Sequence, residues 1–155
     1  MHITKDELLA GRDKKYKQDY TQEISDNLDK LLIPINKLRD AYGIALQVNS
    51  GWRPPAINLS TPGAAPHSKH MVGLAVDIND PNGKLRDWCL QNLQMMKDLG
   101  IYMEDFRWTS VSNSGGWVHW QLGPPKSGKR IFVPSAARSQ FPNVWSGQYD
   151  SQYDD

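Results

Sequence analysis

Cysteine and long apolar runs are nearly absent from this sequence. The single cysteine, Cys89, excludes an intramolecular disulfide, and no apolar run approaches the roughly 20 residues that cross a membrane. The N-terminal segment is polar and of mixed charge, without the apolar centre of a secretory signal. We therefore expect synthesis in the cytoplasm without a signal peptide, and action outside the cell only after release or as part of a virion.

An excess of charge of either sign is also lacking. The 155 residues have a formal net charge of +1, so no strong overall field attracts the chain to nucleic acid or to an anionic membrane. We predict neither nucleic acid nor membrane as a partner. A nucleic-acid binder that uses tryptophans and the basic segment 124–135 is the weakest hypothesis on this charge.

Tryptophan and proline, in contrast, are plentiful. Six tryptophans and ten prolines indicate a compact, loop-rich protein with aromatic surfaces. The length suits one domain with a hydrophobic core. We predict a single domain over 1–155, with its core in about 1–135 and an extended tail in about 136–155.

Hydrophobic periodicity predicts mixed helices and strands. Apolar residues recur at steps of three and four over 21–43, which predicts a helix that Pro34 should kink or split. The remaining expected elements are a short helix at 5–11, strands at 44–50, 72–78, 101–108 and 117–122, a loop at 51–68, and a helix at 84–100. Since helices and strands do not alternate regularly, the fold class should be α+β, with helices packed on a small, largely antiparallel sheet.

The segment SKHMVGLAVDI (68–78) carries His70 and Asp77 among small and apolar residues. A buried aspartate is costly unless a cation compensates its charge. His119 lies in the middle of the later strand WVHWQL, and neighbouring strands would bring the three side chains together. Two histidines, a carboxylate and an open position form a known catalytic zinc arrangement. The alternative is that the histidines are hydrogen-bonded core or rim residues and that Asp77 caps a turn.

Three ordered blocks, SGWRPPAIN, SKHMVGLAVDI and WVHWQ, resemble the zinc D,D- and L,D-peptidases of bacterial cell-wall metabolism. That family includes D-alanyl-D-alanine carboxypeptidases and phage endolysins, and shares its fold with the Hedgehog signalling domain. The resemblance implies Zn²⁺ as cofactor, with His70, Asp77 and His119 as ligands. It also implies that Arg53 stabilises the developing oxyanion and that Ser68 contacts the ligands or the substrate.

The general base is where this chain departs from the family pattern. Many members carry Glu or Asp three residues before the last histidine, where this chain has Gly116. The nearest other carboxylates are Glu104 and Asp105, on a segment expected to pair with WVHWQL. Alternation in a strand places these two side chains on opposite faces. We predict Glu104 as the base, with two ordinary surface acids as the alternative.

The resemblance implies a peptidase that cuts peptidoglycan stem peptides near a D-amino acid. Trp52, Trp117 and Trp120 could line the substrate groove, with at least one of them in the core. The small size predicts a phage- or prophage-encoded enzyme. The competing hypothesis is a non-catalytic zinc-binding module that recognises wall peptides or serves in a virion, and Gly116 is its main support.

Overall fold

The computed structural model describes residues 2–110 and 116–134. The helices are α1 (Lys5–Leu9), α2 (Arg12–Lys15), α3 (Gln22–Tyr42), α4 (Pro55–Ser60), the 3-10 helix η1 (Lys69–Val72), α5 (Lys84–Gln91), α6 (Leu93–Asp98) and α7 (Phe106–Thr109). The strands are β1 (Val48–Ser50), β2 (Ala75–Asn79), β3 (Ile101–Glu104), β4 (Trp117–Leu122) and β5 (Ile131–Phe132). The predicted α+β class is confirmed. The predicted tail at 136–155 lies outside the described residues, and the single domain stays a prediction.

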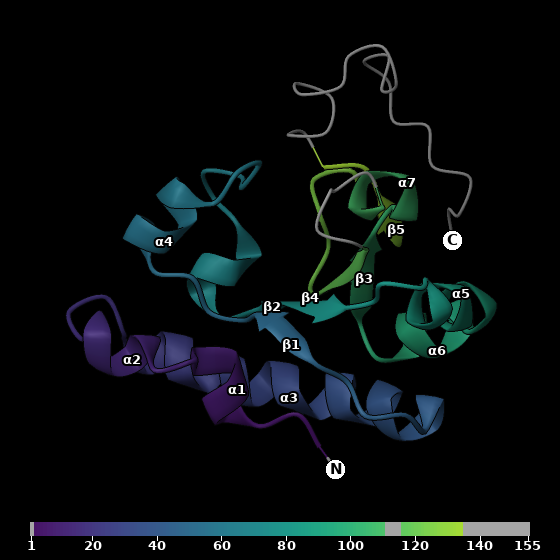
Figure 1. The fold of residues 1–155 in the computed structure, drawn as a ribbon, viewed down its shortest axis with the longest axis horizontal. Coiled ribbons are helices and arrows are strands. Elements are labelled where there is room, and N and C mark those ends of the chain that lie inside the picture. Colours follow the sequence, from purple (N-terminus) through teal and green to yellow (C-terminus); the bar gives the residue numbers. More distant parts are fainter. Residues whose placement is uncertain (1, 111–115, 135–155) are drawn as a thin grey trace.

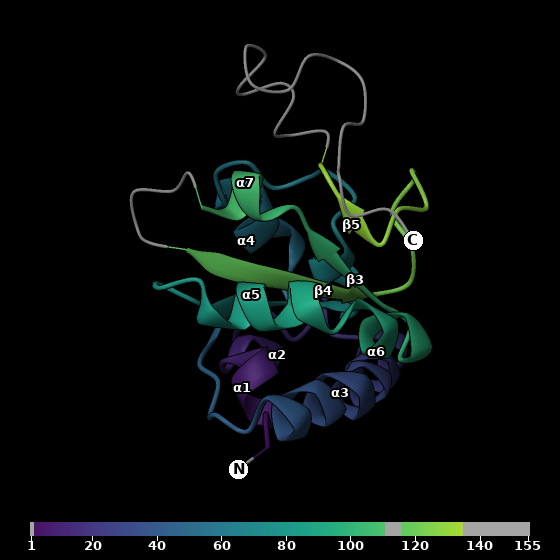
Figure 2. The same ribbon diagram turned by 90° about the vertical axis from the view of Figure 1, so that its right-hand side faces the viewer.

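The five strands form one sheet in the order β1-β2-β4-β3-β5. Neighbouring strands are antiparallel except β3 and β5, which are parallel. The prediction of a largely antiparallel sheet is therefore confirmed, with one parallel pair that was not anticipated. Helix α3 runs below β1 and β2, whereas α4 and α7 lie at the upper end of the molecule (Figure 1, Figure 2).

Strand register divides the sheet into an apolar face and a polar face. Val76 lies opposite Trp120, and Trp120 lies opposite Met103; these three side chains belong to the buried core. Between them, Asp77 lies opposite His119. Because successive side chains on a strand point to opposite faces, the residues that could hold a metal lie on the face away from this core.

The long helix α3 is continuous over 21 residues, although Pro34 lies inside it. Of the two predicted effects of Pro34, the split is wrong, and the kink stays a prediction. Proline removes one backbone donor from the helix interior, but Pro34 is buried together with apolar residues before and after it. The packing of this continuous stripe on the core outweighs the lost hydrogen bond. Thr21 caps the start, and Gly43, with φ +82°, ends the helix.

Two segments predicted as uniform contain other elements. The loop at 51–68 contains α4, where Pro54 precedes the helix and Pro55 is its first residue. The two prolines therefore begin a helix, since the first helical turn does not need their missing N–H groups. The strand predicted at 101–108 ends at Glu104, because the Asp105 side chain accepts a hydrogen bond from Arg107 N and caps α7.

Other boundaries also differ from the predictions. The helix at 84–100 is interrupted at Asn92, between α5 and α6. The strand expected at 44–50 begins only at Val48, and that at 72–78 begins at Ala75 after the 3-10 turn η1. Within the described ranges, no helix combines the length and apolar character that a membrane-crossing segment requires.

Candidate metal centre and active site

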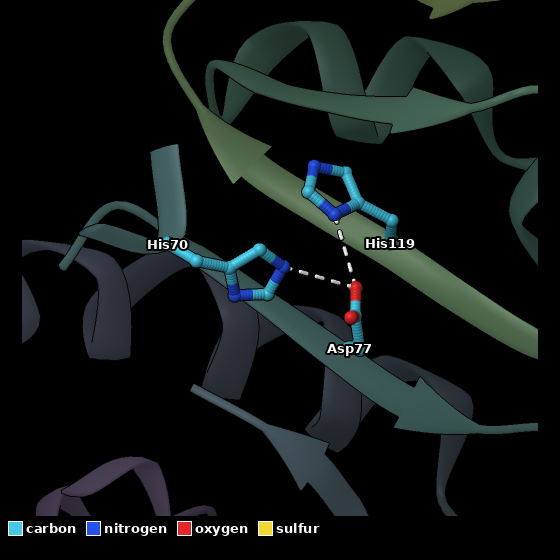
Figure 3. Close-up of side chains that lie close together, drawn as sticks. All are labelled: His70, Asp77 and His119. Atoms are coloured by element: carbon cyan, nitrogen blue, oxygen red, sulfur yellow. Dashed lines mark hydrogen bonds and ion pairs between the residues drawn. The ribbon is translucent and has the colours of Figure 1, made fainter. Parts of the chain in front are cut away.

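Two neighbouring strands and one turn bring together the histidines and the aspartate that the sequence singled out. Asp77 on β2 lies directly opposite His119 on β4, and His70 comes from η1, just before β2. Figure 3 shows both imidazole rings pointing at the Asp77 carboxylate. Asp77 Oδ1 lies 3.2 Å from His70 Nε2 and 3.0 Å from His119 Nδ1.

One potential ligand atom from each of the three residues lies within 4.8 Å of the other two. His70 is fully buried and His119 is 6% exposed. In the part of the chain that the structure describes, this is the one group of histidine, cysteine or acidic side chains arranged to hold a metal ion.

The three side chains differ in the direction in which the protein shifts their pKa values. Burial lowers the pKa of His70 more than Asp77 raises it, which favours a neutral ring. Burial also acts to lower the pKa of His119, but Glu104 and Asp77 outweigh it and raise this pKa to about 9. Burial acts to raise the pKa of Asp77, but the two imidazoles prevail and hold it well below its usual range.

The hydrogen bonds of the histidines show that this arrangement suits a cation. His70 Nδ1 donates to the Gly51 carbonyl oxygen at 2.8 Å, so a neutral His70 has a lone pair on Nε2. That lone pair faces Asp77 Oδ1, and two acceptors in contact repel each other unless a positive centre lies between them. Two imidazole nitrogens and a carboxylate are ligand types that zinc takes. The donor set therefore fits zinc.

The two adjacent carboxylates at the end of β3 have different environments. Tyr102 lies opposite Gln121, so alternation places Glu104 on the same face as His119. Glu104 Oε1 is 3.9 Å from His119 Nδ1. Burial raises the pKa of Glu104, and Asp77 adds to the rise, against the opposing effects of His119 and Arg53. Glu104 thus lies beside the cluster of His70, Asp77 and His119, in a poorly solvated position.

Asp105, in contrast, is a structural residue. It is completely buried, and its carboxylate accepts hydrogen bonds from the Arg107 backbone and guanidinium group. These contacts begin α7 and leave the carboxylate committed to its own helix. Neither acid is an ordinary surface residue, since Glu104 has only 15% of its side chain exposed.

Arg53 is close to the same acidic groups. Its guanidinium donates to Ser68 Oγ at 3.2 Å, and Ser68 Oγ also accepts from the His70 backbone N–H at 3.2 Å. Burial lowers the pKa of Arg53, while Asp77 and Glu104 raise it. Among the described residues, none accepts a hydrogen bond from the buried Nε of Arg53.

The tryptophans differ in exposure. Trp52 and Trp120 are fully buried, and Trp52 donates from its indole to the Met71 carbonyl. The prediction that Trp52 contacts substrate is therefore corrected, because this side chain has no exposed surface. Trp117 is half-buried at the start of β4, on the face of His119, so it alone of the three has surface beside the site.

Gly116 lies where β4 begins, and its surroundings explain why no side chain is present. A Cβ built on Gly116 would lie 2.8 Å from the Asp80 carbonyl oxygen. The Asp80 N–H in turn donates to the Gly116 carbonyl, so the two backbones are held together. A carboxylate at 116 would need this backbone contact to open.

Some basic and polar residues near these blocks are not part of the cluster. His67 is exposed in the segment between α4 and η1. Arg130 is buried against the ring of Tyr102, with 4.0 Å between its guanidinium carbon and the ring centroid, and it donates to the Ile101 carbonyl. It is therefore tied to β3 and does not belong to a solvated basic loop.

Two supporting residues could not be recognised from sequence. The Gly51 carbonyl orients His70, and Gln121 Oε1 accepts from His119 Nε2 at 2.9 Å. The pairing of Gly51 with His70 spans 19 positions and gives no periodic signal. Gln121 could have been noted only because it is two residues from His119 in a strand and so shares its face.

Comparison with known proteins connects this geometry to a family. A family model described as Peptidase M15 matches residues 1–112, which are 112 of the 155 residues. The match includes His70, Asp77 and Glu104 and ends before His119. Searches of curated proteins and of solved structures found no match.

Proposed function

Because the chain belongs to the peptidase M15 family, we propose that it is a zinc-dependent D,D- or L,D-peptidase that cuts peptidoglycan stem peptides at D-amino acids. The observation that carries this proposal is the cluster of His70, Asp77 and His119 on the polar face of the sheet, with Glu104 beside it. A fold alone does not establish an activity, so the roles below follow from the site.

His70, Asp77 and His119 would hold the ion, since one nitrogen of each histidine faces the same carboxylate oxygen. When bound, zinc supplies Lewis acidity, which polarises a carbonyl group and makes water nucleophilic near neutral pH. Asp77 also balances the charge of the ion in this buried setting. The histidines and the aspartate are therefore binding groups, and proton transfer falls to another residue.

Glu104 is the proposed general base. A base that works near neutral pH needs a pKa near that pH, and burial moves the pKa of Glu104 in this direction. In the proposed mechanism Glu104 Oε1 accepts a proton from the attacking water and then donates it to the leaving amine. The distance of 3.9 Å between Glu104 Oε1 and His119 Nδ1 supports this role, because a water molecule held at the cluster would lie close to Oε1.

Arg53 is proposed to stabilise the negative oxygen that forms on the attacked carbonyl. A fixed cation in a site of low polarity stabilises such charge without reorganising. Ser68 holds one end of the guanidinium, and Asp77 and Glu104 are close enough to keep it charged. Ser68 and Trp117 are proposed substrate contacts beside these groups.

Phage or prophage origin is part of the proposal, with action on the cell wall after release or as part of a virion. The second candidate is a non-catalytic zinc-binding module for wall recognition or virion structure. Gly116 favours it, because the carboxylate common in the family at this position is missing. The two candidates differ in turnover and agree in zinc binding.

The test is mass spectrometry of purified peptidoglycan and soluble stem peptides after incubation with the zinc-loaded protein. We expect a new fragment whose mass identifies the cleaved bond, absent with His70→Ala. Peptides from several wall chemistries that all remain intact, while the protein binds one zinc ion, would support the non-catalytic module and overturn the peptidase proposal.

A further inference from the structure

The two histidines of the cluster are oriented by different means. His70 Nδ1 bonds to a backbone carbonyl, that of Gly51, which can only accept a hydrogen bond. His119 Nε2 bonds to the side-chain amide of Gln121 at 2.9 Å. An amide has one accepting and one donating end, so the orientation of Gln121 decides which nitrogen of His119 carries hydrogen.

A second hydrogen bond sets the orientation of Gln121. Its Nε2 donates to the Gly123 carbonyl oxygen at 3.1 Å. Since a carbonyl oxygen can only accept, the amide NH₂ faces Gly123 and Oε1 faces His119. His119 Nε2 must then donate, so that a neutral His119 ring has its lone pair on Nδ1, the nitrogen that faces Asp77. Gln121 is 5% exposed, so water has little access to replace these contacts.

Gly123 itself is placed by the turn after β4. Its φ is +97°, and its N–H donates to the Gly100 carbonyl at 3.3 Å. Non-glycine residues adopt this φ only with strain. A Cβ at 123 would meet only Lys69 Nζ, at 3.6 Å, so there is enough space for a side chain. Glycine is favoured at this position by its backbone conformation and not by a lack of space.

We propose that Gln121, held by Gly123, is a positioning residue that keeps Nδ1 of His119 open to the metal. This inference rests on the proposed zinc site and goes beyond it, because it assigns a role to a residue that contacts neither the metal nor the substrate. Groups that orient metal-binding histidines typically contribute about 10- to 100-fold to metal affinity. We therefore expect substitution of Gln121 to change zinc affinity more than it changes the stability of the fold.

The first test measures zinc affinity of the full chain by competition with a chromophoric chelator. Gln121→Met keeps the length of the side chain and removes the acceptor, and we expect zinc affinity to fall about 10- to 100-fold. Gln121→Glu keeps an acceptor for His119 and should recover most of that loss. In the zinc-loaded wild type, NMR should show a slowly exchanging Nε2–H proton on His119, and this signal should be lost in Gln121→Met.

A second pair of variants leaves Gln121 intact. Gly123→Ala and Gly128→Ala both place a side chain at a positive φ, +97° and +73°, in the same segment. No atom lies within 4 Å of a Cβ at 128, so Gly128→Ala is a control for backbone strain. We expect the two metal-free variants to lose a similar amount of thermal stability. Only Gly123→Ala should weaken zinc binding.

The outcomes separate this inference from the proposed function. Wild type that binds zinc with the same affinity as Gln121→Met and Gly123→Ala would overturn the positioning role and leave the metal site standing. Equal weakening in Gly123→Ala and Gly128→Ala would reduce the effect to general strain and also overturn it. Wild type that does not bind zinc would overturn the metal site and this inference together.

Discussion

Glu104 and Asp105 are adjacent carboxylates with different partners. Glu104 faces the metal cluster, 3.9 Å from His119, whereas Asp105 is bonded to the first turn of α7. A difference of one position, between the last residue of β3 and the cap of α7, thus separates a side chain that faces the histidines from one that is committed to a helix cap. This contrast provides a pair of variants that test chemistry and folding separately.

We expect Glu104→Gln to lower the rate of peptide cleavage by about 10²- to 10⁴-fold, because a general base contributes that much. Zinc affinity and the thermal midpoint should stay close to wild type. Asp105→Asn should instead lower the free energy of unfolding by about 1–3 kcal/mol, since buried donors lose a charged partner, and keep most of the activity. Steady-state kinetics measure the cleavage rates, and urea unfolding measures the free energies of unfolding. Full activity in Glu104→Gln would contradict its proposed role as general base.

Cys89 permits a prediction about pH. Burial raises the pKa of its thiol to about 12, from an ordinary value of 9.0. The native thiol stays protonated while the unfolded thiol ionises, so the unfolded state binds fewer protons above pH 9 and stability falls as pH rises towards 12. We expect the free energy of unfolding, measured with urea, to fall less between pH 9 and 11 in Cys89→Ala than in the wild type.

The same burial predicts slow alkylation of native Cys89 by iodoacetamide at neutral pH, because the thiolate is the reactive form. Labelling should require unfolding. Rapid labelling of the native protein would show that the thiol is accessible, against the fully buried position described above.

At the scale of elements, the starts of β4 and α5 are locked together at Asp80. The Asp80 carboxylate accepts from the N–H groups of Leu85 and Arg86 at the beginning of α5, and its backbone contacts Gly116 at the beginning of β4. This backbone contact leaves no room for a side chain at position 116, where many zinc peptidases that this chain resembles carry a carboxylate. The packing of β4 against the start of α5 therefore excludes a general base at position 116.

We expect Gly116→Ala to lower the free energy of unfolding by about 1–3 kcal/mol, because its Cβ would lie 2.8 Å from the Asp80 carbonyl oxygen. Gly116→Glu should be destabilised at least as much and should show no gain in turnover. Chemical denaturation and cleavage assays measure the two effects. An active and fully stable Gly116→Glu protein would contradict the steric account.

At the scale of the whole molecule, zinc binding should couple to stability. The proposed ligands come from η1, β2 and β4, so the proposed site exists only when the sheet is formed. A ligand that binds only the native state stabilises it by about 4 kcal/mol at 1,000 times its dissociation constant. The proposed ligands Asp77 and His119 are 42 residues apart in the chain, so zinc bound to both would hold distant segments together.

Removal of zinc by a chelator should therefore lower the thermal midpoint, by about 2–4 °C for each kcal/mol in a chain of this size. The midpoint should rise again as zinc is added. Calorimetry with and without zinc measures this, with His70→Ala as the control that should not respond. A wild-type midpoint that is independent of zinc would contradict the site.

Local patterns were sufficient for much of this protein. Apolar periodicity predicted the course of α3. Residue type and spacing allowed His70, Asp77 and His119 to meet if their strands were neighbours, and the resemblance to the zinc peptidases implied that they do. The α+β class also followed from the order of these patterns. Strand ends were less predictable, because side-chain caps such as Asp105 compete with the extended backbone.

The sequence by itself thus determined the fold class, the course of α3 and the types of groups available for a metal site. Only the tertiary structure decided which face each group shares. Strand register placed Glu104 beside His119, packing buried Trp52 completely, and the parallel pairing of β5 with β3 completed the sheet. These outcomes depend on contacts between distant segments, and a shift of one residue in register would move every side chain of a strand to the other face.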